Sequence, residues 1–482
     1  MPLRADHARS LVTRAQPTSR LAALRACLAG CVVIAMSGAA VADSDLLSVY
    51  RLAQTNDPVW EAAHRALLAT EQKLPQARAD LLPSLGLNSG YNKTRSDVAF
   101  AQDPATARDY PGWNWNLQLT QPLFRAANWA ALDQAHAIVE LARYQFAQAE
   151  QDLILRVAQA YFDILVAQEA VRAGQAQVAA VDLQMNLAQR GFQAGTHAIT
   201  DVHEARSRLE LGRSQYIASQ ADLDAKVAEL SKITAVRLSE LKAADGSARH
   251  VSPQPDDADS WEMQARESAW AVRQQTATVA IAEQELRKQK AGHLPTLDLT
   301  ASVGRSFSGS SNSTQLDYSS RVQTRQIGVQ LTWPLFAGGG TTARVSEAAE
   351  SYEKSKSDLE TARRQSATTA RQAYGLVRSG LAQIEALTLA VAAGRESVKA
   401  NQAGYRLGTR NNVDVLNAEQ LLYTAVRDLA KARYDTLFMS LKLRASTGSL
   451  GESDVQAFNA WLYQRAALTT SDSAAASDSS SR

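Results

Sequence analysis

The chain has 482 residues, a formal net charge of +2 and two cysteines, and hydrophobic residues make up 45% of it. The first 42 residues contain five Arg and one Asp, so the remaining residues carry a net charge of −2, from 46 basic and 48 acidic side chains. This balance excludes a strongly basic nucleic-acid-binding protein. Because no cysteine follows Cys31, disulfide and thiolate chemistry are excluded beyond that point.

The N-terminus is typical of an export signal, which we place at residues 1–42. A basic region precedes an apolar stretch at 28–35, and Ala40-Val41-Ala42 has the form of a cleavage site before Asp43. Residues 28–31 (Leu-Ala-Gly-Cys) resemble a lipoprotein cleavage box, so lipidation of Cys31 remains open as an alternative. No later stretch approaches the length of a spanning apolar helix, and we expect an exported protein without a helical membrane anchor.

The rest of the sequence contains an internal duplication. Three motifs recur in one order: Leu-Pro-Ser/Thr-Leu at 82 and 294, Pro-Leu-Phe at 122 and 334, and Gly-Thr at 195 and 408. The first two recur after 212 residues (294 − 82, 334 − 122) and the third after 213 (408 − 195). A repeat of this length indicates two similar structural halves rather than a small solenoid repeat.

Long helices are predicted in both halves, because proline is absent between Pro122 and Pro253 and after Pro334. In the first half they span about 126–190 and 199–241, and in the second about 342–405 and 412–447. A helix of 65 residues extends roughly 100 Å and must pack along its neighbours as a coiled coil. Shorter helices are predicted at about 46–82 and 261–293, with a kink or break in the first at Pro75.

Strands are predicted between the short and the long helices. Around 113–124, 297–303 and 327–333, apolar and polar residues alternate, and residues 85–92 alternate more loosely. Strands of about ten residues with one apolar face fit an outer-membrane barrel with a wet lumen. An ordinary sheet with one buried face gives the same alternation, but the export signal and the lack of spanning helices favour the barrel. The loops of the two hairpins are expected at 92–112 and 308–324.

Four strands cannot close a membrane barrel, because the known minimum is about eight and an open edge cannot face lipid. At least two copies must therefore contribute strands. Two copies give eight strands and an essentially filled lumen, whereas three copies give twelve strands and a pore.

The predicted domain organisation follows from these elements. It comprises the signal peptide (1–42), first-half helices (43–83), first hairpin (84–125), first long helix pair (126–242), linker (243–260), second-half helix (261–294), second hairpin (295–337), second long helix pair (338–447), equatorial C-terminal segment (448–465) and disordered tail (466–482).

This layout resembles the TolC family of outer-membrane channel proteins. The resemblance extends from about Asp43 to Ala460, and it also rests on the strings at 81–87, 198–202 and 408–416. It implies an α+β membrane protein in which four transmembrane strands per chain join a trimeric 12-strand barrel, continued by a long periplasmic α-helical barrel. It further implies a homotrimer in the outer membrane of a Gram-negative bacterium, working with a periplasmic adaptor protein and an inner-membrane transporter of the resistance-nodulation-division, ABC or major facilitator type.

The resemblance also implies roles for residues near the two breaks between the long helices. Thr200 and Asp201 would face Tyr405 and Arg410, in links that hold the periplasmic tip shut. Such hydrogen bonds to a carboxylate can break and re-form, as a gate requires.

Asp414 matches the family's tunnel-constriction aspartate, and three copies would make an acidic ring that favours cations. The family's second aspartate position is Asn417 here, which predicts weaker cation block. A helix N-terminal carboxylate, favoured by the helix dipole, is a plausible additional role for Asp414.

Gly195, Thr196, Gly408 and Thr409 would lie at the turns that meet the adaptor, although glycine also simply terminates helices. We expect no catalytic constellation, no metal site and no cofactor, and hence no enzyme. The sequence favours an exit duct for drugs, for type I secretion of proteins, or for both. The alternative is a non-transport coiled-coil scaffold or adhesin that spans the periplasm.

Overall fold

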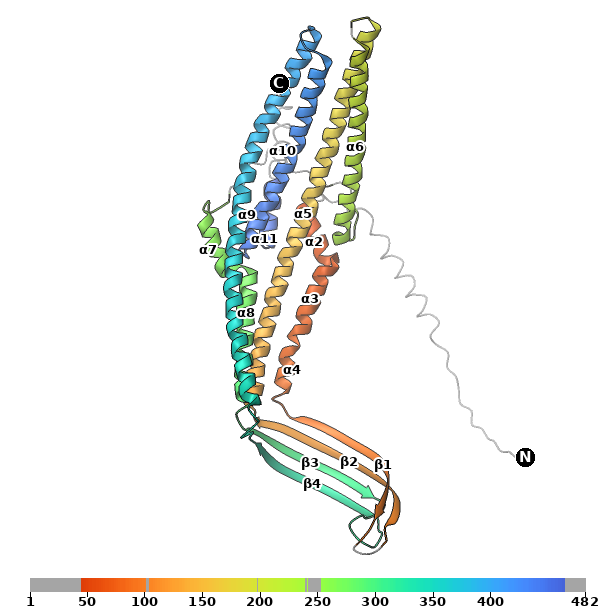
Figure 1. Cartoon of the computed structure of the whole chain (residues 1–482), viewed down its shortest axis with the longest axis vertical. Helices are drawn as coiled ribbons and strands as arrows, with labels where there is room; N and C mark the ends of the chain where they lie inside the picture. The colour runs from red at the N-terminus through yellow and green to blue at the C-terminus, as the bar shows by residue number, and fades with distance from the viewer. Residues whose placement is uncertain (1–44, 101–103, 197, 239–240, 242–252, 464–482) are drawn as a thin grey trace, which may run out of the picture. The chain divides into compact units, whose positions relative to one another are not determined.

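The computed structural model describes residues 45–463, apart from 101–103, 197, 239–240 and 242–252 (Figure 1). The predicted signal peptide with Cys27 and Cys31, most of the predicted linker at 243–260 and the tail at 466–482 lie outside the described residues.

The N-terminal helical segment consists of three helices, α2 (Leu46–Asn56), α3 (Pro58–Glu71) and α4 (Lys73–Ala79). Asp57 ends α2 and caps α3, where its carboxylate accepts a hydrogen bond from the Trp60 backbone N–H at 3.1 Å and Pro58 begins the helix. The expectation of one helix broken at Pro75 was wrong in detail. The breaks are at Asp57 and Gln72, and Pro75 lies in the first turn of α4, where its missing N–H costs little.

Four long helices form two antiparallel pairs, α5 (Ala126–Gln193) with α6 (Ile199–Thr234) and α9 (Gly340–Arg406) with α10 (Asn412–Ser446) (Figure 1). At 1.5 Å per residue, the 68 residues of α5 extend about 100 Å. The two pairs are joined because α5 also packs against α10. Helix α6 ends seven residues before the predicted boundary at 241, because Ala235 adopts a left-handed conformation with φ of 57°.

Between the halves lie α7 (Ala258–Ser268) and α8 (Trp270–Ala291), and α11 (Glu452–Tyr463) follows α10. The sequence predicted one helix at 261–293, but extended backbone at Ala269 divides it into α7 and α8. The Asp257 carboxylate caps α7 and sets its start three residues earlier than expected.

The largest apolar core lies where α2, α5, α6, α10 and α11 meet. Tyr161 and Phe162 of α5 are its largest fully buried side chains, and the Phe162 ring contacts the rings of Tyr434 and Phe458. Burial of one such side chain contributes roughly 1.5–3 kcal/mol. Four of the nine buried residues along α9 are alanines, which allow close helix packing.

Helix α9 also contains a stretch that is long and apolar enough to cross a membrane, by length and composition only. No such stretch was predicted from the sequence beyond the N-terminal signal. Although α9 packs against α10, α8 and α7, only 17% of this apolar stretch is buried within the chain.

The four strands form one antiparallel sheet in the order β1-β2-β3-β4: β1 (Ser84–Val98), β2 (Thr106–Phe124), β3 (Thr296–Ser308) and β4 (Ser320–Thr332). Pairing of β2 with β3 fuses the two halves of the duplication. The strands contain 13 to 19 residues rather than about ten, and much of the predicted loop at 92–112 is paired. Apolar alternation stops before the strands do, because the distal residues are polar on both faces.

The register gives the sheet two chemically distinct faces. Leu87, Leu117 and Val303 lie side by side on one face, and Asn88, Asn116 and Gly304 lie side by side on the other. The apolar face is strongly exposed, with Leu87 at 67%. An exposed apolar band opposite a polar face indicates a lipid-facing and a lumen-facing surface.

Candidate functional site

The turn between α5 and α6 is stabilised by a complete Schellman motif. The Gly195 N–H donates to the Phe192 carbonyl at 3.0 Å, and the Thr196 N–H donates to the Gly191 carbonyl at 2.9 Å. The Thr196 hydroxyl donates to the same Gly191 carbonyl at 3.0 Å. Gly195 has φ of +75°, a conformation that disfavours any residue with a Cβ.

The turn between α9 and α10 repeats these bonds position by position. The Gly408 N–H donates to the Tyr405 carbonyl at 3.1 Å, and the Thr409 N–H and hydroxyl both donate to the Gly404 carbonyl. Gly408 has φ of +74°. The duplication is therefore preserved at the level of single hydrogen bonds. All four residues expected at the tips, Gly195, Thr196, Gly408 and Thr409, are exposed.

Asp414 forms a capping box with Asn411 at the start of α10. The Asn411 side chain accepts from the Asp414 N–H at 2.8 Å, and the Asp414 carboxylate accepts from the Asn411 N–H at 3.3 Å. Arg410 lies 3.9 Å from the same carboxylate. The additional role considered for Asp414, a helix N-terminal carboxylate, is thus seen directly.

Asp201 and Tyr405, two of the four residues expected in the gate, lie close together. Burial raises the pKa of the Tyr405 phenol, and the negative charge of Asp201 raises this pKa further. The Asn412 side chain donates to the Asp201 backbone carbonyl at 3.3 Å and joins α10 to α6. Leu416 of α10 also belongs to one buried apolar cluster with Leu209 of α6. The two helix pairs are therefore in contact at their turns.

The other two expected gate residues have different surroundings. The Thr200 side chain is exposed and makes no hydrogen bond with another described residue. Arg410 pairs with Asp414 on its own helix turn rather than with Asp201. The structure thus brings Asp201 to Tyr405 but does not add Thr200 or Arg410 to that pair.

Asn417, the second expected constriction residue, accepts a hydrogen bond from the guanidinium of Arg208 on α6 at 3.2 Å. Arg208 also donates to Glu204 at 3.0 Å, so it is held between a carboxylate on its own helix and an amide on α10. Sequence reasoning did not identify Arg208 as part of this site.

A buried carboxyl group lies nearby on α10 and was also missed. Glu419 is 3% exposed and accepts a hydrogen bond from Gln402 of α9 at 3.1 Å, while its second oxygen has no hydrogen-bond partner among the described residues. Burial raises the pKa of Glu419. Comparison of the two halves could have drawn attention to it, since Glu419 and Asn412 stand opposite Arg206 and Ile199 at the 213-residue offset.

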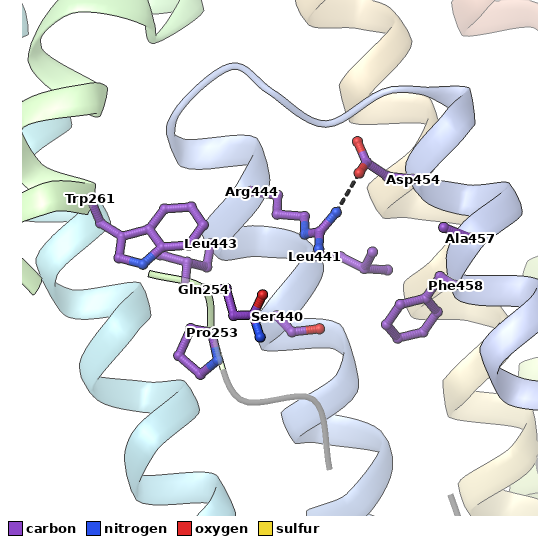
Figure 2. Close-up of a pocket in the computed structure, with 10 residues that line it drawn as sticks. All are labelled: Pro253, Gln254, Trp261, Ser440, Leu441, Leu443, Arg444, Asp454, Ala457 and Phe458. Atoms are coloured by element: carbon purple, nitrogen blue, oxygen red, sulfur yellow. Dashed lines mark hydrogen bonds and ion pairs between the residues drawn. The ribbon is translucent and has the colours of Figure 1, made fainter. Parts of the chain in front are cut away.

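Two hollows provide further candidates. A groove of about 500 Å³ between α5 and α6 is lined near the first turn by Phe192, Ile199 and Val202. A cavity of about 260 Å³ is lined by Trp261 of α7 and by residues of α10 and α11. Figure 2 shows these side chains beside the ion pair of Arg444 with Asp454. This ion pair joins the end of α10 to the start of α11, so we assign the cavity a structural role.

No group of three or more His, Cys, Asp or Glu side chains that could hold a metal occurs within the described part of the chain. What the site does contain is two matching turns, a contact between the helix pairs and several carboxylates. A sheet with one lipid-facing side, joined to helices about 100 Å long, defines the class as a subunit of a membrane channel with a long helical extension.

The chain belongs to the family described as "Outer membrane efflux protein", whose profile matches residues 49–236 and 261–449. It is 33% identical over 440 residues to the proteases secretion protein PrtF of Dickeya chrysanthemi, covering 89% of this chain and 94% of PrtF. It is 32% identical over 428 residues to the outer membrane protein TolC of Escherichia coli, covering 86% and 84%.

Solved structures agree on the fold. The chain superimposes on CusC, whose crystal structures describe transmembrane channel formation, with a TM-score of 0.73 and 15% identity, covering 85% of this chain and 93% of CusC. The α+β channel-tunnel fold, the TolC-like family and the location in the outer membrane of a Gram-negative bacterium are thereby confirmed. The family is one of transport channels that work with adaptors and inner-membrane transporters.

Proposed function

We propose that three copies of this chain form a 12-strand barrel and a periplasmic helical tunnel that serves as an exit duct. The observation that carries this proposal is the open sheet, in which β1 and β4 each have one partner strand among the described residues. In hydrocarbon, an open edge leaves backbone groups unsatisfied, so the edges must pair between copies. Three copies give twelve strands, enough to enclose a water-filled lumen.

The gate of the duct is the contact of α6 with α9 and α10. Asp201 of α6 and Tyr405 of α9 carry the link, and the Asn412 side chain ties α10 to α6 beside it. The exposed Thr200 and Arg410 are available to a neighbouring copy. In three copies, Asp414 would give a ring of carboxylates below the gate, with Asn417 weakening that ring.

The exposed glycine turns and the groove between α5 and α6 are the proposed docking points for a periplasmic adaptor. The sequence has no glycine-rich phosphate loop, so an inner-membrane transporter of the resistance-nodulation-division, ABC or major facilitator type must supply the energy. The likeness to PrtF, a protein named for protease secretion, supports proteins exported by type I secretion as one cargo, alongside drugs.

The gate is tested by Asp201→Ala and Tyr405→Phe in purified protein inserted into planar bilayers. Each change should raise single-channel conductance, because each weakens the link that holds the helix pairs together. Tyr352→Phe, on α9 and away from the turns, is the matched control and should leave the conductance at the wild-type value. Wild-type conductance in both gate variants would refute the link.

The duct itself is tested in a deletion strain. Loss of a secreted protein, greater antibiotic sensitivity, or both should follow the deletion, and the wild-type gene should restore them. A strain with an unchanged secretome and unchanged drug sensitivity would instead support a passive scaffold.

A further inference from the structure

The apolar face of the sheet carries three arginines toward the strand ends that are far from the helices. Arg305 lies on β3, and Arg321 and Arg325 lie on β4. Gln323 is directly opposite Arg305, so Arg321 and Arg325 are the two diagonal neighbours of Arg305 on the same face. Diagonal neighbours in an antiparallel pair are about 7–8 Å apart, within reach of long side chains. The three residues form the arginine cluster.

Within the described part of the chain, no acidic side chain balances the charge of the arginine cluster. All three side chains are exposed, and none has an ion-pair partner among the described residues. Lys93, on the same face of β1, is by contrast paired with Asp109 at 3.1 Å. Like charges held side by side on a sheet destabilise it, so an external anion would stabilise this cluster.

The arginine cluster lies at the height expected for lipid headgroups. Arg305 lies eight residues beyond Leu297 on β3, about 27 Å along the strand and about 20 Å in height at the usual barrel tilt. This height is close to that of the apolar band, roughly 25 Å, that crosses an outer membrane.

Aromatic side chains occur in the same rows of the sheet. Trp115 is directly opposite Arg305, the Trp113 and Phe307 rings stack at 6.0 Å, and the Arg321 guanidinium lies 5.7 Å from the Phe307 ring. Aromatic residues mark the membrane interface. Because the helices are periplasmic, this interface is the outer leaflet.

We propose that Arg305, Arg321 and Arg325 bind the phosphate groups of a phosphorylated glycolipid in the outer leaflet of the outer membrane. Guanidinium groups bind phosphate oxygens through paired, charge-assisted hydrogen bonds. Below the cluster, Val303 and Ile327 continue the apolar face on which the acyl chains of such a lipid would lie. The site depends on the sheet spanning the membrane and is independent of the gate.

The test compares the triple variant Arg305→Gln, Arg321→Gln, Arg325→Gln with wild-type protein in detergent. The control is Arg78→Gln, Arg363→Gln, Arg395→Gln, which removes the same charge from exposed helical positions. Thermal unfolding is followed during titration with diphosphorylated lipid A, with the same lipid after removal of its phosphates, and with inorganic phosphate.

Diphosphorylated lipid A should raise the unfolding midpoint of wild type and control by several degrees, and the cluster variant should require at least tenfold more lipid. An equal response of the cluster variant, or of wild type to the dephosphorylated lipid, would overturn the proposal. Equal protection by inorganic phosphate would overturn the glycolipid as the ligand. If the triple variant fails to fold, Arg305→Gln and Arg325→Gln singly should each weaken the response. Wild-type conductance of these variants would separate this site from the duct.

Discussion

At the scale of single residues, the carboxylate of Asp414 takes part in two structures at once. It completes the capping box of α10 with Asn411, and it lies where the resemblance to TolC proteins places the tunnel constriction. Removal of the whole side chain would therefore mix a helix-capping effect with a charge effect. A change that keeps a hydrogen-bond acceptor separates the two.

Asp414→Asn should reduce cation selectivity, because it removes the charge while an amide oxygen can still accept from the Asn411 N–H. Asp414→Ala should reduce selectivity equally and in addition cost about 0.5–1.5 kcal/mol of stability through loss of the hydrogen bond from the Asn411 N–H. The reversal potential in a salt gradient measures the first effect, and thermal unfolding measures the second. A reversal potential that stays at the wild-type value in both variants would count against an acidic ring.

The buried carboxyl group of Glu419 should make stability depend on pH. Since its pKa is raised in the folded chain, the folded state binds the proton more tightly than the unfolded state. The contribution of Glu419 to stability is therefore greatest below the ordinary pKa of Glu, about 4.3, and it is lost as the pH rises through the raised value.

Glu419→Gln removes this titration and keeps an oxygen that can accept from Gln402. The variant should unfold at a higher temperature than wild type at alkaline pH and at the same temperature near pH 4. Glu347→Gln, an exposed position on α9, should reproduce the wild-type pH dependence. A constant difference between Glu419→Gln and wild type at every pH would contradict the prediction.

At the scale of elements, the two helix turns are defined by short-range hydrogen bonds that can be predicted from the local sequence. Glycine followed by threonine predicts a helix end, and the structure adds that the threonine hydroxyl shares the carbonyl bonded by its own N–H. The close approach at Gly404 could not be foreseen. A Cβ there would lie 2.7 Å from the Arg410 side chain, which depends on how the chain folds back.

Gly195→Ala and Gly408→Ala should each destabilise their turn by about 1–2 kcal/mol, because both glycines have positive φ. Faster hydrogen exchange at the Thr196 and Thr409 amides would report the loss. Gly375→Ala is the matched control: it lies inside α9 with open space around a Cβ, and it should stabilise the helix by about 0.5–1 kcal/mol. Unchanged exchange in the turn variants would show that the motif does not limit the order of the tips.

An element can be predicted from the sequence when it is defined by interactions between residues that are close in sequence. Long helices and their turns follow from local composition, so α5 and α9 lie within a few residues of their expected bounds. The break at Ala269 has no proline or glycine signal, and the strand ends beyond Asn92 are held by partner strands and by loop contacts such as that of Ser96 with Asn312.

Among the candidate site residues, Glu419 and Arg208 were missed for a similar reason. Their importance arises from burial and from a contact between helices of different halves. Asp201 and Tyr405, which the motif resemblance indicated, do lie near one another, and their role as a gate stays a prediction.

At the scale of the whole molecule, the sheet is the part that requires other copies. Its apolar face and the outer edges of β1 and β4 have no partner elements among the described residues, while the long helices already pack as pairs. Because successive residues of a strand lie on opposite faces, the same substitution at two neighbouring positions should have opposite effects on assembly.

Val329→Asp should lower the amount of heat-resistant oligomer in the outer membrane, because residue 329 lies on the lipid-facing side and is 61% exposed. Gln330→Asp places the same charge one residue later, on the lumen side, and should be tolerated. Unheated gel electrophoresis and native mass spectrometry would measure the oligomer, expected to contain three chains. The opposite ranking of the two variants would show that the faces are assigned wrongly.

The open sheet affects the stability of the exported chain before it assembles in the outer membrane. A newly exported copy carries two unpaired strand edges and an apolar surface through an aqueous compartment, and such edges promote aggregation. Its sheet gains full stability only when other copies close it, so folding and assembly are linked through protomer concentration. Cells that make too few copies, or that lack a carrier for the exported chain, should therefore lose the protein to proteolysis rather than accumulate stable monomers.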